Sequence, residues 1–431
     1  MKYFSLHHQA PKVTFREAVI RGIAPDRSLY FPEKITALPR SFFDQITSLT
    51  HQEIAFQAIE QFVAGEIPAP ELEQILDAVL DFDFPLLELD AHTAVLELFH
   101  GPTMAFKDVG ARFMARCLEY FNRDDDREVT ILVATSGDTG GAVANGFLGV
   151  KGVKVVILYP SGKVSDIQER QLTTLGQNIT ALEVQGTFDD CQRMVKKAFL
   201  DQDILSGKRL TSANSINIAR WLPQMFYFLF AYKQTKERNL DIVFSVPSGN
   251  FGNICAGMMA QKLGMPCAHF VAATNVNDTV PQFMENQVYA PKPSVATISN
   301  AMDVGDPSNF IRIRQLYNDQ FTELQKHLSS YSYSDEETRE AMKALYKQFG
   351  YVADPHGAVG FLGLRKYQES HQNVLGVFLE TAHPIKFLRV VKETLGLDLA
   401  LPPQIQKVMD REKVSMPITS YQDLKEFLLH P

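Results

Sequence analysis

The sequence predicts an α/β protein built on mostly parallel β-sheets. From about residue 92 onward, short runs of β-branched and apolar residues alternate with stretches of helical periodicity. Strands separated by helices of roughly 10–20 residues are typical of βαβ units, whose strands pair in parallel. Ligands of such sheets bind beyond the carboxyl ends of the strands, so we expect the chemistry in the loops that follow the strands.

The expected elements follow from this alternation. The first 90 residues are polar and broken by prolines, and helices are predicted there near 14–22, 50–63 and 70–80. Ser165 and Gln168 form the capping box of a helix that reaches about residue 175. Strands are predicted at 129–134, 153–159, 179–184, 242–246, 268–273 and 374–379, and helices at 139–149 and 188–200.

Length and composition describe an ordinary globular chain. Its 431 residues suggest two or three domains. Hydrophobic residues make up 45% of the chain and charged residues 21%, which excludes disorder as a description of the whole. The formal charge of −8 argues against a surface that binds nucleic acid, because such a surface needs clustered positive charge. A local basic pocket for a small anionic molecule remains compatible with this charge.

Cysteine usage and hydropathy point to a cytoplasmic protein. The four cysteines form no Cys-x-x-Cys pair, so neither a zinc site nor a redox motif is expected. Such cysteines are typical of buried thiols in a reducing compartment. The amino terminus lacks the apolar core of a signal peptide. The longest apolar stretch, near 225–232, falls short of the roughly 18 residues that a membrane span needs.

The first candidate loop is Ser-Gly-Asn-Phe-Gly-Asn at 248–253, between a predicted strand and a helix. Glycines let backbone N–H groups approach an anion, and the helix amino terminus adds its dipole. A phosphate group is therefore the expected ligand of this loop. The loop lacks the Lys-Ser/Thr of a P-loop and the full GxGxxG dinucleotide pattern. A tight turn without a ligand is the alternative.

Two further candidates lie earlier in the chain. Residues 136–140, Ser-Gly-Asp-Thr-Gly, offer hydroxyls and amides that could hold a carboxylate, and capping by Asp138 or Thr139 is the alternative. Lys107 lies among apolar residues in His-Gly-Pro-Thr-Met-Ala-Phe-Lys-Asp. Desolvation lowers a lysine pKa, and a neutral amine can form a Schiff base. The alternative is a solvated charge at a helix start.

Two later segments complete the candidates. Thr381 follows the predicted strand at 374–379, and its alternative role is to cap the helix near Pro384. The stretch 212–220, Ser-Ala-Asn-Ser-Ile-Asn-Ile-Ala-Arg, concentrates amides, hydroxyls and one arginine before a helix. It predicts either an anion clamp or an amide-rich turn.

Taken together, the motifs at 100–108, 136–140, 245–253 and 380–387 occur in an order that resembles the threonine synthase family. These are pyridoxal-phosphate enzymes of the tryptophan-synthase-β, or type II, fold. The resemblance covers nearly the whole chain, including the amino-terminal REAVIRG and LYFPE stretches and the segment AATNVNDTVP. The family usually reads Asp-Gly-Gly-Leu-Tyr where this chain has Asp26, Arg27 and Ser28, a departure that concerns a local turn.

The resemblance implies a role for each motif. Lys107 matches the lysine that bonds covalently to the cofactor, and Thr381 the hydroxyl at its pyridine nitrogen. Asp138 stands where many fold relatives have Asn beside the cofactor 3′-oxygen, and an ionised Asp cannot donate that hydrogen bond. The residues matching the loop that holds the cofactor phosphate are Ser248, Gly249, Asn250, Phe251, Gly252 and Asn253. Those matching the substrate site are Ser136, Gly137 and Thr139 for the carboxylate, and Asn214, Ser215, Asn217 and Arg220 for the phosphate.

The resemblance also implies an architecture of two three-layer αβα domains with mostly parallel sheets, plus a helical amino-terminal domain. We expect that amino-terminal domain at 1–90. The large cofactor domain is expected at 91–114 and 236–431, with a small αβ domain inserted at 115–235. A monomer without nucleic-acid or membrane partners is expected.

The implied reaction converts O-phospho-L-homoserine and water to L-threonine and phosphate, with pyridoxal 5′-phosphate as the cofactor. A phospholyase that stops at elimination and releases 2-oxobutyrate, and a serine or threonine dehydratase of the same fold, remain alternatives. A cofactor-carrying regulatory protein without turnover is disfavoured by the intact Lys107 and both glycine-rich loops. A flavin or nicotinamide oxidoreductase is disfavoured by the lack of GxGxxG.

Overall fold

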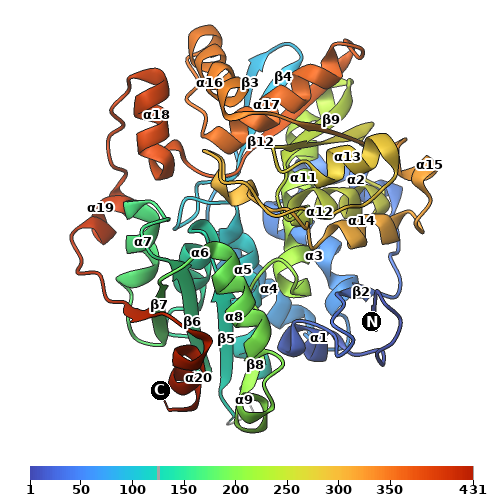
Figure 1. Cartoon of the computed structure of the whole chain (residues 1–431). Helices are drawn as coiled ribbons and strands as arrows, with labels where there is room; N and C mark the ends of the chain where they lie inside the picture. Colours follow the sequence, from blue (N-terminus) through green and yellow to red (C-terminus); the bar gives the residue numbers. More distant parts are fainter. Residues whose placement is uncertain (124–126, 431) are drawn as a thin grey trace. The chain divides into compact units, whose positions relative to one another are not determined.

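The computed structural model describes residues 1–123 and 127–430 and is an α/β fold with two mostly parallel sheets. The predicted fold class is confirmed. Two compact units divide the chain. Unit 1 comprises Met1, Pro32–Phe106 and Trp221–Ala400, and unit 2 comprises Lys2–Phe31, Lys107–Arg220 and Leu401–Pro431. Each unit contains one of the large sheets (Figure 1).

Unit 2 is built on a five-stranded sheet in the order β13-β7-β6-β5-β8. Every pair in it is parallel. Three long, β-branched central strands carry most of its apolar residues, and the two edge strands are short. The strands are β5 (Val129–Ala134), β6 (Val153–Pro160), β7 (Ile179–Val184), β8 (Arg209–Thr211) and β13 (Met416–Ile418).

Helices cover both faces of this sheet. Leu132, Val156 and Leu182 point to one face, where they pack with buried residues of α8 (Phe188–Ala198) and α20 (Tyr421–Leu429). Their strand neighbours, which face the other way, are buried as well, except for the partly exposed Glu183. Other helices of unit 2 are α1 (Phe15–Arg21), α5 (Lys107–Phe121), α6 (Asp138–Phe147), α7 (Asp166–Thr173), α9 (Gln202–Gly207) and α19 (Pro403–Met409).

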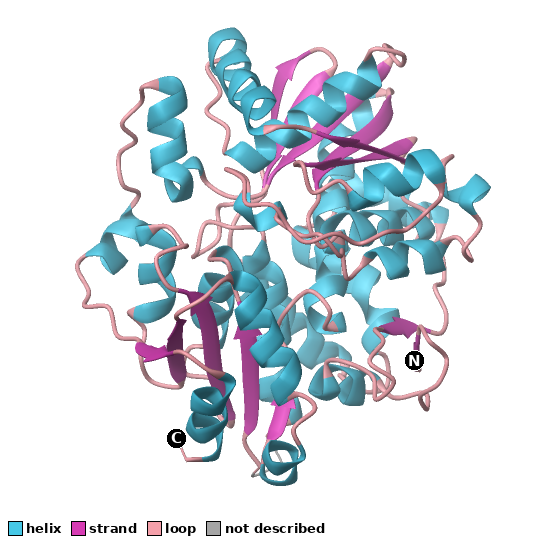
Figure 2. Cartoon of the chain, viewed as in Figure 1, coloured by secondary structure: helices cyan, strands magenta, loops and turns pink. Residues whose placement is uncertain are grey.

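Unit 1 is built on a six-stranded sheet in the order β11-β10-β9-β12-β4-β3. All pairs are parallel except β3 with β4, which are antiparallel and carry an irregularity near Glu88. Figure 2 shows these strands in magenta with helices packed around them. They are β3 (Leu86–Asp90), β4 (Thr93–Glu97), β9 (Asp241–Pro247), β10 (His269–Thr274), β11 (Leu328–Ser332) and β12 (Val374–Glu380).

Helix α17 (Pro355–Gln368) lies close to this sheet because a glycine faces it. A Cβ at Gly363 would come within 2.8 Å of the Cβ of Ala273, so a larger residue would push the helix outward. The other helices of unit 1 are α2 (Arg40–Gln45), α3 (His51–Val63), α4 (Ala69–Val79), α11 (Met225–Thr235), α12 (Gly252–Lys262), α13 (Thr279–Asn286), α14 (Phe310–Leu316), α15 (Phe321–Leu324), α16 (Asp335–Phe349) and α18 (Leu388–Leu395).

The amino-terminal turn forms despite the missing glycines. Asp26 Oδ1 accepts the N–H of Ser28, and Arg27 adopts a left-handed φ of 65°, a conformation that glycine adopts without steric cost. The turn leads from β1 (Tyr3–Ser5) and α1 into β2 (Tyr30–Pro32), and the two strands pair. The departure from the family pattern therefore leaves the turn in place.

The six predicted strands are present within one residue at each end, and the capping box of Ser165 and Gln168 forms at α7. The short strands β1, β2, β3, β4, β8, β11 and β13 were not predicted, and β1, β2 and β3 lie in the first 90 residues, where only helices were expected. The division into domains at 1–90, 91–114 with 236–431, and 115–235 stays a prediction.

Candidate active site

The glycine-rich loop at 248–253 connects β9 to α12 in unit 1. Phe251 has a left-handed φ of 59°, and α12 begins at Gly252, so the loop ends on free amides of a helix start. Gly249 cannot carry a side chain, because a Cβ there would lie 2.8 Å from the carbonyl oxygen of Ala301. The backbone at Ala301 and Met302 packs against this side of the loop, and only glycine permits that approach.

Asn253 gives this loop an unusual polar group. The residue is 6% exposed, yet both its Nδ2 and its Oδ1 are buried without a hydrogen-bond partner among the described residues. Leaving such a group unsatisfied costs about 1–3 kcal/mol. A carboxamide that can donate, beside free amides at a helix start, fits an anionic oxygen group such as a phosphate.

Thr381 directly follows β12 in unit 1 and is 7% exposed. Its carbonyl accepts the N–H of Phe106, and an antiparallel bridge joins Ala105 to Ala382. The next helical turn is capped by His383, whose Nδ1 accepts the N–H of Ile385 at 3.0 Å. The alternative role of Thr381 as a helix cap is therefore wrong.

Lys107 is the first residue of α5 in unit 2, directly after Phe106. Its side chain is only 17% exposed, and its Nζ lies 4.0 Å from Oδ2 of Asp138, a carboxylate that is 4% exposed. The other oxygen of Asp138 accepts a hydrogen bond of 3.0 Å from Nε2 of Gln168. Lys107 therefore faces a buried acceptor rather than solvent.

The loop at 136–140 takes its shape from Thr135, which precedes it. The hydroxyl of Thr135 accepts the N–H groups of Gly137 and Gly140 at 2.9 and 2.8 Å. Gly137, with a φ of 135°, is the N-cap residue of α6 and no side chain caps the helix, so neither Asp138 nor Thr139 acts as the cap. Ser136, just before α6, and Thr139, in its first turn, are both partly exposed.

The stretch at 212–220 adjoins this loop, because β8 pairs with β5. Asn214 Nδ2 donates to the carbonyl of Ala134, and Ser215 is partly exposed. Asn217 is buried and donates to the carbonyls of Val19 and Ser212. Arg220 is 3% exposed and donates to the carbonyl of Ala213. The structure thus brings this stretch and the 136–140 loop together in unit 2.

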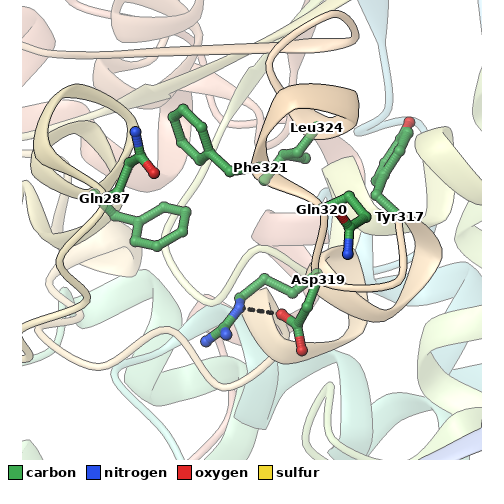
Figure 3. A pocket seen from close by; sticks show the side chains of 8 residues that line it. Gln287, Tyr317, Asp319, Gln320, Phe321 and Leu324 are labelled. Atoms are coloured by element: carbon green, nitrogen blue, oxygen red, sulfur yellow. Dashed lines mark hydrogen bonds and ion pairs between the residues drawn. The ribbon is translucent and has the colours of Figure 1, made fainter.

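A separate hollow of about 190 Å³ lies in unit 1 beside α13, α14 and α15 (Figure 3). Arg314 and Asp319 form an ion pair of 2.6 Å at its edge. None of the residues predicted for the site lines it. Its other lining residues are Phe283, Gln287, Tyr317, Gln320, Phe321 and Leu324.

Comparison with known proteins decides the family. Residues 84–378 match the family described as pyridoxal-phosphate dependent enzyme, 2–79 match the threonine synthase N terminus and 357–428 the threonine synthase C-terminal region. A threonine synthase of Escherichia coli is 42% identical over 422 residues, covering 98% of this chain and 96% of that protein. The chain belongs to the threonine synthase family. Its activity is that of a threonine synthase, a pyridoxal-phosphate-dependent lyase.

Solved structures of threonine synthases agree with this assignment. The crystal structure from Escherichia coli superimposes with a TM-score of 0.93 at 41% identity and covers 100% of this chain and 99% of that one. The pyridoxal-phosphate-bound threonine synthase from Brucella melitensis gives a TM-score of 0.92 at 32% identity, covering 100% of this chain and 99% of its own. In the described part of the chain, no helix is long and apolar enough to cross a membrane.

Two residues that shape this threonine synthase site were missed in the sequence. Thr135 is the first residue of the predicted loop after residues 129–134 but has no expected role of its own, and Gln168 is expected only as a helix cap. The capping box correctly predicts the start of α7, but it uses only the side-chain oxygen of Gln168. The side-chain amide nitrogen remains available for a second contact. Ser165 N–H donates to its Oε1, which leaves Nε2 for Asp138. That second contact joins residues 30 positions apart, and no local pattern reveals it.

Proposed function

We propose that this chain converts O-phospho-L-homoserine and water to L-threonine and inorganic phosphate, using pyridoxal 5′-phosphate held by the predicted site residues. One observation carries the proposal: a lysine shielded from solvent faces a buried carboxylate at the start of α5. An amine so placed is suited to take up and release protons, because the carboxylate stabilises its ammonium form.

The residues that would hold the cofactor fit its chemistry. Lys107 supplies the amine for covalent attachment. The amides of Gly249, Asn250, Phe251, Gly252 and Asn253 receive the phosphate, and the unsatisfied carboxamide of Asn253 supports this role. Ser248 shapes the loop instead, because its N–H donates to the carbonyl of Ala273 and its hydroxyl to that of Val246. Thr381 supplies an uncharged hydroxyl to the pyridine nitrogen, and its freedom from capping supports that assignment. When bound, the cofactor stabilises negative charge at the substrate Cα.

The protein supplies the positioning and the proton transfers. Lys107 moves protons at Cα and Cβ of the substrate, and Asp138 stabilises its ammonium form between transfers. Ser136, Gly137 and Thr139 hold the substrate carboxylate beside the start of α6, where the helix dipole favours negative charge. Loss of the γ-phosphate, addition of a proton at Cγ and addition of water at Cβ then give threonine.

The substrate phosphate is assigned to Asn214, Ser215, Asn217 and Arg220. Arg220 can bind a phosphate oxygen pair with two parallel hydrogen bonds. Asn217 contributes to phosphate binding through the backbone of the stretch, because its side-chain Nδ2 already donates to the carbonyls of Val19 in α1 and Ser212. Asn214 and the partly exposed Ser215 are the members with side chains nearest to solvent.

The experiment is incubation of the purified holoenzyme with O-phospho-L-homoserine, with threonine, 2-oxobutyrate and phosphate measured together. One threonine per phosphate is expected. Equal amounts of 2-oxobutyrate and phosphate would instead identify a phospholyase. Release of pyruvate from serine, or of 2-oxobutyrate from threonine, without need of the phosphorylated substrate, would identify a dehydratase.

The domain division at 1–90, 91–114 with 236–431, and 115–235 belongs to the same proposal. The family match of residues 2–79 supports a separate amino-terminal part.

The chain acts as a monomer in the cytoplasm. Its four cysteines are free thiols, which supports a reducing compartment. Sedimentation of the holoenzyme tests the oligomeric state.

A further inference from the structure

Arg312 is an arginine with no exposed surface in the core of unit 1. It lies on α14, and its guanidinium stacks on the ring of Trp221 with a distance of 4.4 Å to the ring centroid. Burial lowers the pKa of this guanidinium to about 9. Burying a charge in this way is costly unless hydrogen bonds compensate for the lost water.

The guanidinium leads to the phosphate-binding loop through one residue. Arg312 Nη1 donates to Oδ1 of Asn309 at 2.7 Å. Asn309 donates twice to the carbonyl of Asn250, once from its backbone N–H and once from its Nδ2, both at 3.1 Å. Asn309 stands at the N-cap position of α14 but forms no cap with its side chain. Its carboxamide serves the link between Arg312 and Asn250 instead.

This link fixes one peptide plane of the loop. In a trans peptide the carbonyl of one residue and the N–H of the next point in opposite directions. With the carbonyl of Asn250 held by Asn309, the N–H of Phe251 must point away from Asn309. The side chain of Asn250 is held too, because its Oδ1 accepts the N–H of Ser308 at 3.2 Å. The left-handed φ of Phe251 is thereby stabilised from outside the loop.

Resting on the proposed role of residues 248–253, we propose that Arg312 is a positioning residue for cofactor binding. Acting through Asn309, it holds the 250–251 peptide so that the N–H of Phe251 is presented to the cofactor phosphate. Arg312 does not touch the cofactor. Its charge orients the Asn309 carboxamide, with the oxygen toward Arg312 and the nitrogen toward Asn250.

The test compares binding of pyridoxal 5′-phosphate with binding of pyridoxal, which lacks the phosphate, to the apoprotein by absorbance titration. Arg312→Met keeps an apolar stem on Trp221 and removes the charge. Asn309→Asp keeps the acceptor for Arg312 and replaces the Nδ2 donor with an oxygen. Both variants should weaken binding of the phosphorylated cofactor by about tenfold, the effect of one lost hydrogen bond in a buried site, and leave pyridoxal binding unchanged.

Controls separate this role from simple core packing. Arg314→Met makes the same change on the same helix at a partly exposed position, and should change neither affinity. If Arg312→Met and Asn309→Asp lower both affinities equally, or lower only the melting temperature, Arg312 is a packing residue and the inference is overturned. Should Arg312→Met not fold, Asn309→Asp alone decides.

Asn253→Asp distinguishes failure of the inference from failure of the proposed loop function. It places a carboxylate in the loop itself and should weaken binding of the phosphorylated cofactor but not of pyridoxal. If Asn253→Asp acts and the Arg312 and Asn309 variants do not, the loop binds phosphate without help from Arg312. If none of the three alters the ratio of affinities, the loop is not the phosphate site.

Discussion

Oδ2 of Asp138 lies 4.0 Å from Nζ of Lys107, and Gln168 Nε2 donates to the other oxygen of the same carboxylate. The amide of Gln168 cannot rotate freely, because its Oε1 accepts the N–H of Ser165 in the capping box. Asp138 is therefore held as an acceptor on one side and faces the amine on the other. A helix-capping motif thus determines the orientation of a carboxylate beside the proposed reactive lysine.

Asp138→Asn should raise the reactivity of Lys107 in the apoprotein. Asn can still accept from Gln168 through Oδ1, but it presents an NH₂ group to the lysine and no longer stabilises an ammonium. More of the amine is then neutral at pH 8. The rate of acetylation of Lys107 by acetic anhydride, measured by mass spectrometry of its peptide, should rise several-fold.

The matched control is Asp166→Asn, which removes an exposed carboxylate that pairs with Lys413. It changes the net charge equally and should leave the acetylation rate of Lys107 unchanged. An unaltered rate in Asp138→Asn would mean that this carboxylate does not hold the charge of Lys107.

Lys107→Ala should abolish threonine formation and the visible absorption band of the bound cofactor. No other side chain is expected to supply the attached amine. Lys386 is the alternative candidate for the attached amine, because it lies in the candidate motif at 380–387. It is 1% exposed, and its Nζ donates to the carbonyl of Thr103. If Lys107→Ala keeps the band, reduction with borohydride and peptide mapping would locate the attachment, and Lys386 is the first candidate.

The sequence was sufficient for the strands that form the centres of both sheets. Residues 129–134, 153–159 and 374–379 are apolar except for Thr130, Lys154 and Gly376, and burial on both faces demands such runs wherever they pair. Edge strands lack this constraint. β8 (Arg209–Thr211) and β13 (Met416–Ile418) have three residues each, and β13 contains a proline. Their strand conformation comes from pairing with β5 and β7, which local sequence cannot show.

The candidate loops were also predictable, because glycines and hydroxyls gather where strands end. Their supporting residues were not. Gln168 and Asn309 act across 30 and 59 positions of sequence, respectively, on Asp138 and Asn250. Each looks ordinary alone: a helix-capping glutamine and an asparagine before a helix. Only the folded chain brings them to the loops that they orient.

Arg220→Ala should reduce kcat/KM for O-phospho-L-homoserine by about 2–4 kcal/mol, the range expected for loss of a charged contact to a phosphate. Arg220 is buried and donates to the Ala213 carbonyl, so some loss of stability will accompany this. Cofactor affinity should remain unchanged. Arg193→Ala, at an exposed arginine of the same unit, is the control. An unaltered kcat/KM would remove Arg220 from the substrate site.

His269 should make the protein less stable in mild acid. Burial lowers the pKa of His269 from 6.5 to about 4, while Nδ1–H donates to the carbonyl of Lys326. As the pH falls below 6.5, the unfolded chain binds a proton that the folded protein does not. The free energy of unfolding should therefore decrease between pH 6.5 and 4, by about 2 kcal/mol at pH 5 from this residue.

Urea unfolding of wild type and His269→Gln between pH 7 and 5 measures this contribution. Gln can replace both hydrogen bonds of the ring without titrating, so the variant should lose less stability on acidification than the wild type. His8→Gln, at an exposed histidine, should keep the wild-type dependence. Parallel curves for wild type and His269→Gln would show that His269 is not the group responsible.

Thr381 should determine the reaction that follows cofactor binding. Its hydroxyl is not needed as a cap, since His383 caps the next turn, so Thr381→Val should change the melting temperature little. Thr381→Asp would place a carboxylate at the pyridine nitrogen and favour the protonated form of that nitrogen, because opposite charges attract. Threonine formation should fall, and the absorption of the bound cofactor during turnover should extend to longer wavelength.

Thr381→Ser is the matched control, because it keeps the hydroxyl and should retain both the spectrum and the threonine yield. Product analysis with O-phospho-L-homoserine should show a rise of side products in Thr381→Asp relative to Thr381→Ser. The absorption spectrum provides a reading that is independent of rate, so a variant with slow turnover is still informative. If Thr381→Asp folds, binds the cofactor with the wild-type spectrum and forms threonine at the wild-type rate, the hydroxyl does not contact the pyridine nitrogen.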